Sequence, residues 1–324
     1  MSDQPNTSSY GEEPTSVLDS GLDTEDTDSG LSPDDWQALL TAIRMGRCTP
    51  FLGAGASVPH VRGASSIARD WATEKNFPFP NGTELIKVAQ YLSVRFSPLT
   101  AKELMITECN VAKPSFTPGG IYDVLADLDI PVFLTTNYDS LMTYALESKG
   151  KRPMQELCKW QQRLSPESPL AKGFRPTKDA PLVFHFHGHW SDPDSLVLDE
   201  DDYLEFLKYV AKNPDTIPPQ VQRSLTTSSV LFLGYSLSDW TIQVIFRSIT
   251  EYLSLSHANQ QPHLSVQLVP ALGDQPTPEQ RKQARVYLEK YFGRQHVSVY
   301  WGSCDRFAAE LKSRLGSAAG PSKQ

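Results

Sequence analysis

The sequence of 324 residues lacks the features of several common classes of protein. Its four cysteines, at positions 48, 109, 158 and 304, form no C-x-x-C pair, which argues against a zinc ribbon and against a disulfide framework. No apolar run approaches the ~18 residues that a membrane helix needs, and the N-terminus has no apolar segment typical of a secretion signal. We therefore expect a cytoplasmic protein with reduced structural thiols and no membrane contact.

Basic residues are missing from the first 31 positions, which hold eight of the 38 acidic residues amid Ser, Thr, Pro and Gly. Such a segment has too little apolar mass to order itself, so we expect residues 1–31 to form a disordered acidic tail. Residues 317–324 predict a frayed C-terminal tail. The remaining chain carries 30 acidic and 30 basic residues, and this balance predicts no direct binding of nucleic acid.

Between the tails, short apolar runs alternate with amphipathic helical patterns. The predicted strands are 49–52, 130–134, 181–186, 230–233, 263–269 and 296–301, and the predicted helices include 32–47, 83–96, 100–109, 200–212, 242–253, 278–292 and 306–315. Nearly apolar strands that alternate with helices are typical of a parallel sheet covered on both faces. We predict a doubly wound α/β fold in one domain over 32–316: a mostly parallel, six-stranded, Rossmann-like sheet with helices on both faces and a helical excursion after the first strand. The polar segment 151–180 predicts a surface insertion.

Small or polar residues follow four of these strands at the point where each ends. They are Gly53-Ala54-Gly55-Ala56-Ser57, Thr135-Thr136-Asn137-Tyr138-Asp139, His187-Gly188-His189 and Gly234-Tyr235-Ser236. Ligands of parallel α/β sheets bind outside the carboxyl ends of the strands, so we expect the four segments to form one site. The first turn lets the backbone approach a pyrophosphate, but Val58 replaces the third glycine of the dehydrogenase fingerprint.

Taken in order and spacing over about residues 45–310, these motifs resemble the sirtuin-like domain of bacterial NAD-consuming proteins, many of which are anti-phage effectors. The resemblance implies that NAD is bound as a substrate. It implies that residues 53–57 contact the pyrophosphate, that Asn137 and His187 work on the nicotinamide ribose, and that Gly234 and Ser236 receive the adenosine side. Thr136 and Asp239 are predicted as further NAD contacts.

The sequence departs from the pattern of protein-deacylating sirtuins in two places. It has no zinc module with two C-x-x-C pairs, and its glycine turn continues as Ser57-Val58-Pro59-His60 where those enzymes have G-I-P-D-F-R. Both departures favour water as the nucleophile. We therefore predict an NAD glycohydrolase that forms ADP-ribose and nicotinamide without a metal. Asn137 would hold the ribose hydroxyls or the attacking water, His187 would act as general base, and Asp139 would orient Asn137 or support the positive sugar.

Several plainer interpretations compete with these roles. Strand alternation would put His185, His187 and His189 on one face as a metal cluster; otherwise His185 is buried and hydrogen-bonded and His189 lies at the rim. Asn137, Asp139 and Asp239 are also suited to capping helices. The acidic run 192–202 is interpreted as a solvated helix start.

Two other functions remain open at this point: a non-catalytic module that senses NAD or ADP-ribose, and an NAD-dependent protein deacylase. For the hydrolase we expect a defence role and control in trans, either by homo-oligomerisation or by a regulatory or ATPase partner protein, since one domain leaves no sensor of its own.

Overall fold

The fold is that of a computed structural model, which describes residues 31–58, 60–161, 168, 170, 172–235, 262–267, 277–294 and 296–317. The predicted tails, apart from residues 31 and 317, lie outside the described residues. So do the predicted helix 242–253 and two of the predicted NAD contacts, Ser236 and Asp239.

One sheet of seven parallel strands forms the centre of the molecule, in the order β3-β4-β2-β1-β5-β6-β7. The strands are β1 Cys48–Leu52, β2 Val132–Thr135, β3 Met154–Leu157, β4 Leu182–His185, β5 Ser229–Leu233, β6 His263–Gln267 and β7 Val297–Trp301. The predicted α/β Rossmann-like fold is thus confirmed, but the predicted count of six strands is wrong. The seventh strand, β3, lies in the segment predicted as an insertion, and its half-exposed sequence Met-Gln-Glu-Leu has no apolar run to reveal it.

Side chains that alternate along the strands divide the core into two layers. Phe133 of β2 and Val183 of β4 belong to one layer, and their neighbours Leu134 and Phe184 belong to the other. The first layer includes apolar side chains of α1 Pro33–Arg44, α7 Leu141–Ser148 and α12 Cys304–Ser317. The second includes those of α8 Glu200–Lys212, α9 Pro219–Thr227 and α11 Pro278–Gly293. Both faces of the sheet are therefore covered, as predicted.

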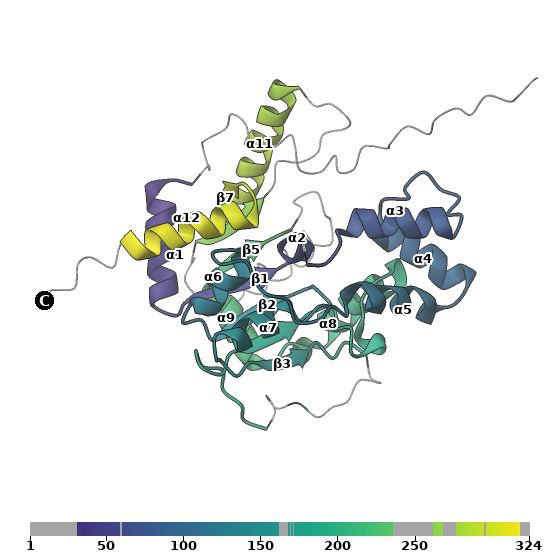
Figure 1. The fold of residues 1–324 in the computed structure, drawn as a ribbon, viewed down its shortest axis with the longest axis horizontal. Helices are drawn as coiled ribbons and strands as arrows, with labels where there is room; N and C mark the ends of the chain where they lie inside the picture. Colours follow the sequence, from purple (N-terminus) through teal and green to yellow (C-terminus); the bar gives the residue numbers. More distant parts are fainter. Residues whose placement is uncertain are drawn as a thin grey trace, which may run out of the picture.

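The predicted helical excursion joins β1 to β2. It consists of α2 Ala54–Ser57, α3 Ala64–Glu74, α4 Leu85–Arg95, α5 Pro98–Cys109 and α6 Ile121–Asp127. Helices α3, α4 and α5 lie together at one end of the molecule, with α1 and α12 toward the other, and α4 contacts α8 (Figure 1). This part of the excursion therefore packs at the end where α8 also lies, whereas α6 contacts α7 and α12. Short 3-10 turns, η1 Pro193–Ser195 and η2 Pro214–Thr216, flank α8.

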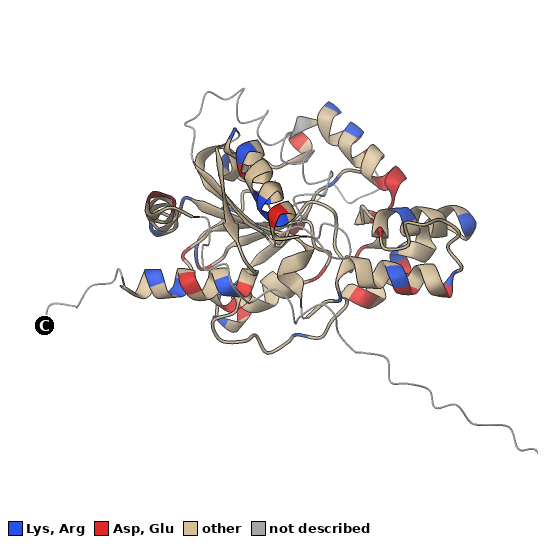
Figure 2. Ribbon diagram, turned by 90° about the horizontal axis from the view of Figure 1, so that it is seen from above, with Lys and Arg blue, Asp and Glu red and all other residues tan. Residues whose placement is uncertain are grey.

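Local signals set several helix starts. Ser32 caps α1 through the backbone N–H of Asp35, whose carboxylate in turn accepts from the backbone N–H of Ser32, and Pro33 stands at the first helical position. Thr277 and Gln280 form the same reciprocal cap at the start of α11. Lys and Arg alternate with Asp and Glu on the outer helices (Figure 2). None of the helices in the described part of the chain is long and apolar enough to cross a bilayer.

Candidate functional site

The four motif-bearing strand ends are neighbours in the sheet. Strands β4, β2, β1 and β5 follow one another in that order, so the segments after His185, Thr135, Leu52 and Leu233 lie side by side. Leu52 pairs with Thr135 on one side and with Leu233 on the other. The structure therefore brings together the described residues of the predicted site, from Gly53 to Gly234.

The glycine turn after β1 packs closely on the turn after β5. The backbone N–H of Gly53 donates to the carbonyl of Leu233 at 2.8 Å, and that of Gly55 donates to the carbonyl of Gly234 at 2.8 Å. Gly234 has a φ of 73°, and a Cβ there would lie 2.1 Å from the backbone nitrogen of Ala56. The glycines are thus required by the contact between the two loops, and two of the N–H groups in the turn already hold the neighbouring strand end.

The side chain of Tyr235 packs against the glycine turn. A Cβ on Gly53 would lie 2.6 Å from the ring of Tyr235, whose hydroxyl donates to the carbonyl of Leu52 at 2.8 Å. The same hydroxyl lies 3.2 Å from the hydroxyl of Thr136, one of the predicted NAD contacts. The second residue of the motif Gly234-Tyr235-Ser236 therefore organises the site, a role that the sequence analysis did not assign.

Asn137 is held by its carboxamide and does not cap the helix that follows it. Its side-chain nitrogen donates to the carbonyl of Gly53 at 3.0 Å and to the hydroxyl of Ser57 at 2.8 Å. These bonds use both N–H hydrogens, so the group left for a ligand is the carbonyl oxygen Oδ1, an acceptor. Asn137 is only 8% exposed, and its backbone N–H is bound by the Thr135 hydroxyl.

Asp139 accepts one hydrogen bond from the glycine turn and one from the helix that follows β2. Its Oδ2 accepts from the Ser57 hydroxyl at 2.7 Å, and its Oδ1 accepts from the backbone N–H of Leu141, the first residue of α7, at 2.9 Å. Burial raises the pKa of this carboxyl, and the hydrogen bond from Ser57 opposes the rise. Ser57 thus connects Asp139 to Asn137.

The three histidines after β4 do not share one face, which the alternative of a histidine metal cluster would require. The rings of His185 and His189 lie 4.9 Å apart, whereas His187 lies edge-on against Tyr203 and Phe206 of α8 at 5.1 and 5.2 Å. The chain leaves the strand after His185 and turns at Gly188, whose φ is 88°. Within the described residues no three His, Cys, Asp or Glu side chains are grouped as a metal site would need.

Each histidine has a different environment. His185 is buried and bonds through Nδ1 to the carbonyl of Asn137, as predicted. His189 was predicted at the rim, but it is 3% exposed and hydrogen-bonded to Ser140 and Ser191. His187 is 2% exposed, its Nε2 has no hydrogen-bond partner among the described residues, and burial lowers its pKa to about 3. The His187 ring is therefore neutral near pH 7, and its Nε2 is a buried polar atom that the described residues leave unsatisfied.

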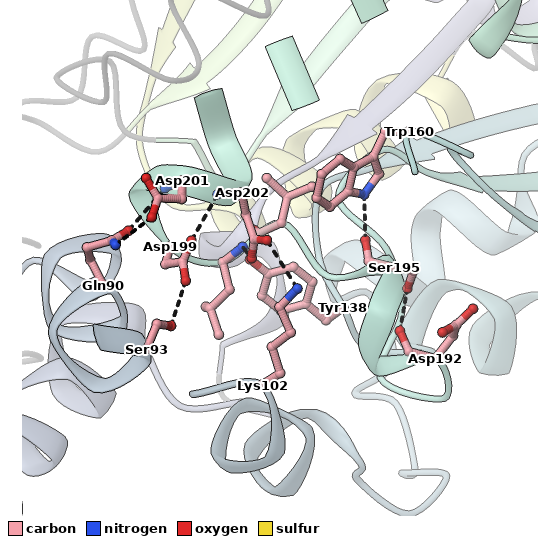
Figure 3. Close-up of polar contacts among 12 residues, drawn as sticks. Gln90, Ser93, Lys102, Tyr138, Trp160, Asp192, Ser195, Asp199, Asp201 and Asp202 are labelled. Atoms are coloured by element: carbon pink, nitrogen blue, oxygen red, sulfur yellow. Dashed lines mark hydrogen bonds and ion pairs between the residues drawn. The ribbon is translucent and has the colours of Figure 1, made fainter. Parts of the chain in front are cut away.

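A polar clasp joins the helical excursion to α8 (Figure 3). The ammonium of Lys102 lies 3.1 Å from Asp202, the hydroxyl of Ser93 donates to Asp199 at 2.6 Å, and the amide of Gln90 donates to Asp201 at 2.9 Å. The acidic run starts α8 as predicted, and Glu200 and Asp201 are exposed, but the capping residue Asp199 is only 5% exposed. The clasp fixes the helix that carries the aromatic neighbours of His187.

Sequence reasoning missed the residues that act across the fold. Tyr122, in α6, lies 3.0 Å from the Ser57 hydroxyl although 65 positions separate them. Lys102 and Asp202 are 100 positions apart. No local pattern marks such pairs. Tyr235, in contrast, lies inside the motif Gly234-Tyr235-Ser236 and could have been predicted as a site residue from the sequence.

Comparison with known proteins agrees with this arrangement. A family profile described as a SIR2-like domain matches residues 131–294, which is half of the chain and runs from β2 through α11. The chain is 28% identical over 223 residues to the NAD(+) hydrolase ThsA of Acinetobacter baumannii (strain 532279), 27% over 239 residues to that of Enterococcus faecium, and 26% over 212 residues to that of Cytobacillus dafuensis.

These alignments cover 67%, 69% and 65% of this chain, but only 41%, 44% and 40% of the three relatives. The chain thus spans less than half the length of the curated relatives that it matches. The profile match contains the Asn137 and His187 motifs, and the alignments extend over about two thirds of the chain. On this evidence the chain belongs to the SIR2-like family.

Proposed function

We propose that the protein hydrolyses the bond between nicotinamide and ribose in NAD. The observation that carries the proposal is the fixed carboxamide of Asn137, which donates both N–H groups to the glycine turn after β1 and so leaves its oxygen Oδ1 as the acceptor for a ligand. The names of the three relatives, each an NAD(+) hydrolase, support the same reaction.

The reaction needs no acid to protonate the leaving group, because the cationic pyridinium of NAD departs as neutral nicotinamide. The enzyme must stabilise positive charge that develops on the ribose and must deliver water. The Oδ1 of Asn137 accepts from a ribose hydroxyl or from the attacking water. Water forms a bond to the anomeric carbon as the bond to the pyridinium nitrogen breaks, and its proton passes to a base.

His187 is the base in this proposal. Its ring is neutral at pH 7, and its buried Nε2 has no partner in the part of the chain that the structure describes. Tyr203 and Phe206 hold the ring edge-on, so their packing sets its direction. Asp139 acts through Ser57, and residues 53–57, Thr136, Gly234, Ser236 and Asp239 contact the rest of NAD.

The test is nicotinamide release from NAD by the purified full chain, beside Asn137→Ala and His187→Ala. Each variant should lose at least about 100-fold in kcat. Asn110→Ala, an exposed asparagine at the end of α5, is the matched control and should retain activity. Equal rates in all four proteins would overturn the assignment. Tight NAD binding without turnover, measured by calorimetry, would favour a sensor, and release of acetate from an acetyl-lysine peptide would favour a deacylase.

We propose further that the activity serves bacterial defence by depleting NAD and that a trigger in trans, a partner or self-association, releases it. Expression of the chain and of Asn137→Ala in cells challenged with phage would test this. We expect the NAD content to fall only with the intact site and only after infection. A fall without infection would remove the trigger from the proposal.

A further inference from the structure

Ser57 stands at the centre of a four-residue hydrogen-bond network that joins three separate elements. Its hydroxyl lies 2.8 Å from the nitrogen of Asn137, 2.7 Å from Asp139 and 3.0 Å from the hydroxyl of Tyr122. Ser57 ends α2, Asn137 and Asp139 follow β2, and Tyr122 belongs to α6. All four side chains are buried, with exposures between 2% and 8%.

The directions of these bonds follow from the atoms present. A hydroxyl has one hydrogen and two lone pairs. The carboxylate of Asp139 takes the hydrogen of Ser57, and the N–H of Asn137 takes one lone pair. Only one lone pair is left for the third neighbour, so the hydroxyl of Tyr122 is the donor in its bond to Ser57.

We infer that Tyr122 is a positioning residue for Asn137, acting through Ser57, an inference that rests on the proposed function for its catalytic consequence. Donation from Tyr122 holds the Ser57 hydrogen on Asp139 and leaves Ser57 as an acceptor for Asn137. With both N–H hydrogens of Asn137 thus engaged, its Oδ1 is fixed as the group that meets the ribose or the water.

The surroundings of Tyr122 keep its hydroxyl in place. Its ring packs against Phe116 at 5.7 Å and against His60 at 6.3 Å. Helix α6 is itself anchored from the far end of the chain, because the carboxylate of Asp305 in α12 accepts from the backbone N–H of Ile121 at 3.1 Å. The helical excursion therefore supplies a part of the site that no strand end provides.

The test removes one hydroxyl and keeps the ring. We expect Tyr122→Phe to lower kcat for NAD about tenfold, the equivalent of one buried hydrogen bond, with little change in KM. Tyr300→Phe is the control, because Tyr300 of the edge strand β7 is also a buried tyrosine, and its hydroxyl donates to Glu310 of α12, away from the Asn137 network. If Tyr122 acts through Ser57, adding Tyr122→Phe to Ser57→Ala should cost nothing more.

A second readout does not depend on activity. In protein labelled with ¹⁵N-asparagine, the side-chain amide of Asn137, identified by its loss in Asn137→Ala, should exchange with solvent at least about tenfold faster in Tyr122→Phe and unchanged in Tyr300→Phe. Unchanged exchange, or an unchanged kcat in an active enzyme, would overturn the role of Tyr122. An inactive wild type with altered exchange would overturn the proposed function alone.

Discussion

The Nδ1 of His185 donates a hydrogen bond to the backbone carbonyl oxygen of Asn137, 2.9 Å away. A carbonyl oxygen can only accept, so this nitrogen carries the ring hydrogen. Burial lowers the pKa of His185 to about 4, which keeps the ring neutral near pH 7. His185, the last residue of β4, thus fixes the backbone of Asn137, whose side chain lies at the centre of the site.

The buried histidines predict a loss of stability in mild acid. The folded-state pKa is about 4 for His185 and about 3 for His187, whereas the ordinary value is 6.5. At a pH between 6.5 and each lowered pKa, the unfolded chain therefore binds more protons than the folded protein. Their stabilisation is complete above about pH 6.5 and falls as the pH is lowered, by up to about 1.4 kcal/mol per pH unit for each ring. Urea unfolding at pH 7, 6 and 5 measures this slope. His185→Gln should reduce the slope, and an unchanged slope would contradict the assignment.

The polar clasp between the helical excursion and α8 predicts that replacing Lys102 lowers the stability of the fold strongly. Lys102 and Asp202 are 9% and 14% exposed at their side chains, so Lys102→Met leaves a buried carboxylate without its cation. We expect a loss of about 2–3 kcal/mol in the free energy of unfolding. Lys113→Met, which breaks an ion pair with Glu147 at 46% and 44% exposure, is the matched control and should change stability by less than about 0.5 kcal/mol. If the two substitutions lowered the free energy of unfolding equally, the clasp would not stabilise the fold more than an exposed ion pair does.

Close packing of the backbone at Gly188 predicts that substitution by alanine costs more stability than its positive φ alone would cause. The φ of Gly188 is 88°, and a Cβ there would lie 2.2 Å from the carbonyl oxygen of Ser195. Gly150 has a similar φ of 76° with no atom within 4 Å of that position. We expect Gly150→Ala to cost about 1 kcal/mol and Gly188→Ala more than about 3 kcal/mol, measured by urea unfolding. Similar costs would show that strain alone requires both glycines.

His187 predicts a conflict between stability and activity. Its ring packs beside Tyr203 and Phe206, and its buried Nε2 meets no hydrogen-bond partner among the residues that the structure describes. Replacing the ring with an apolar side chain of similar size, as in His187→Leu, removes an unsatisfied polar atom and should raise the free energy of unfolding by about 1 kcal/mol. The same variant should release no nicotinamide from NAD. A destabilised His187→Leu would indicate that the ring is retained for packing.

The fold and the strand-end motifs were predictable because both depend on local patterns. Apolar runs marked six strands, and the residue types that follow Leu52, Thr135 and Leu233 marked the edge where they converge. Strand β3 was not predicted because an edge strand needs no apolar run, as its half-buried Gln155 illustrates. The alternative of one histidine face does not hold because it extends the period of a strand past His185, where the strand ends.

The connections within the site were not predictable, because each is a long-range contact between polar side chains of ordinary type. Ser57 was assigned to the pyrophosphate turn, yet in the structure it joins Asn137 to Asp139. Its neighbour Tyr122 comes from an excursion whose sequence shows only helical periodicity. Hydrogen-bond partners at such distances follow from the packed fold and not from spacing.

The bond from Ile121 to Asp305 sets a boundary for working fragments of this protein. A fragment that ended after Trp301 would keep every strand of the sheet and every strand-end motif described here. It would lose Asp305, the anchor of α6, and with it the support of the Tyr122 hydroxyl. A piece that retains the site must therefore extend at least through Asp305 into α12, a helix whose own sequence carries none of the motifs by which the site is found.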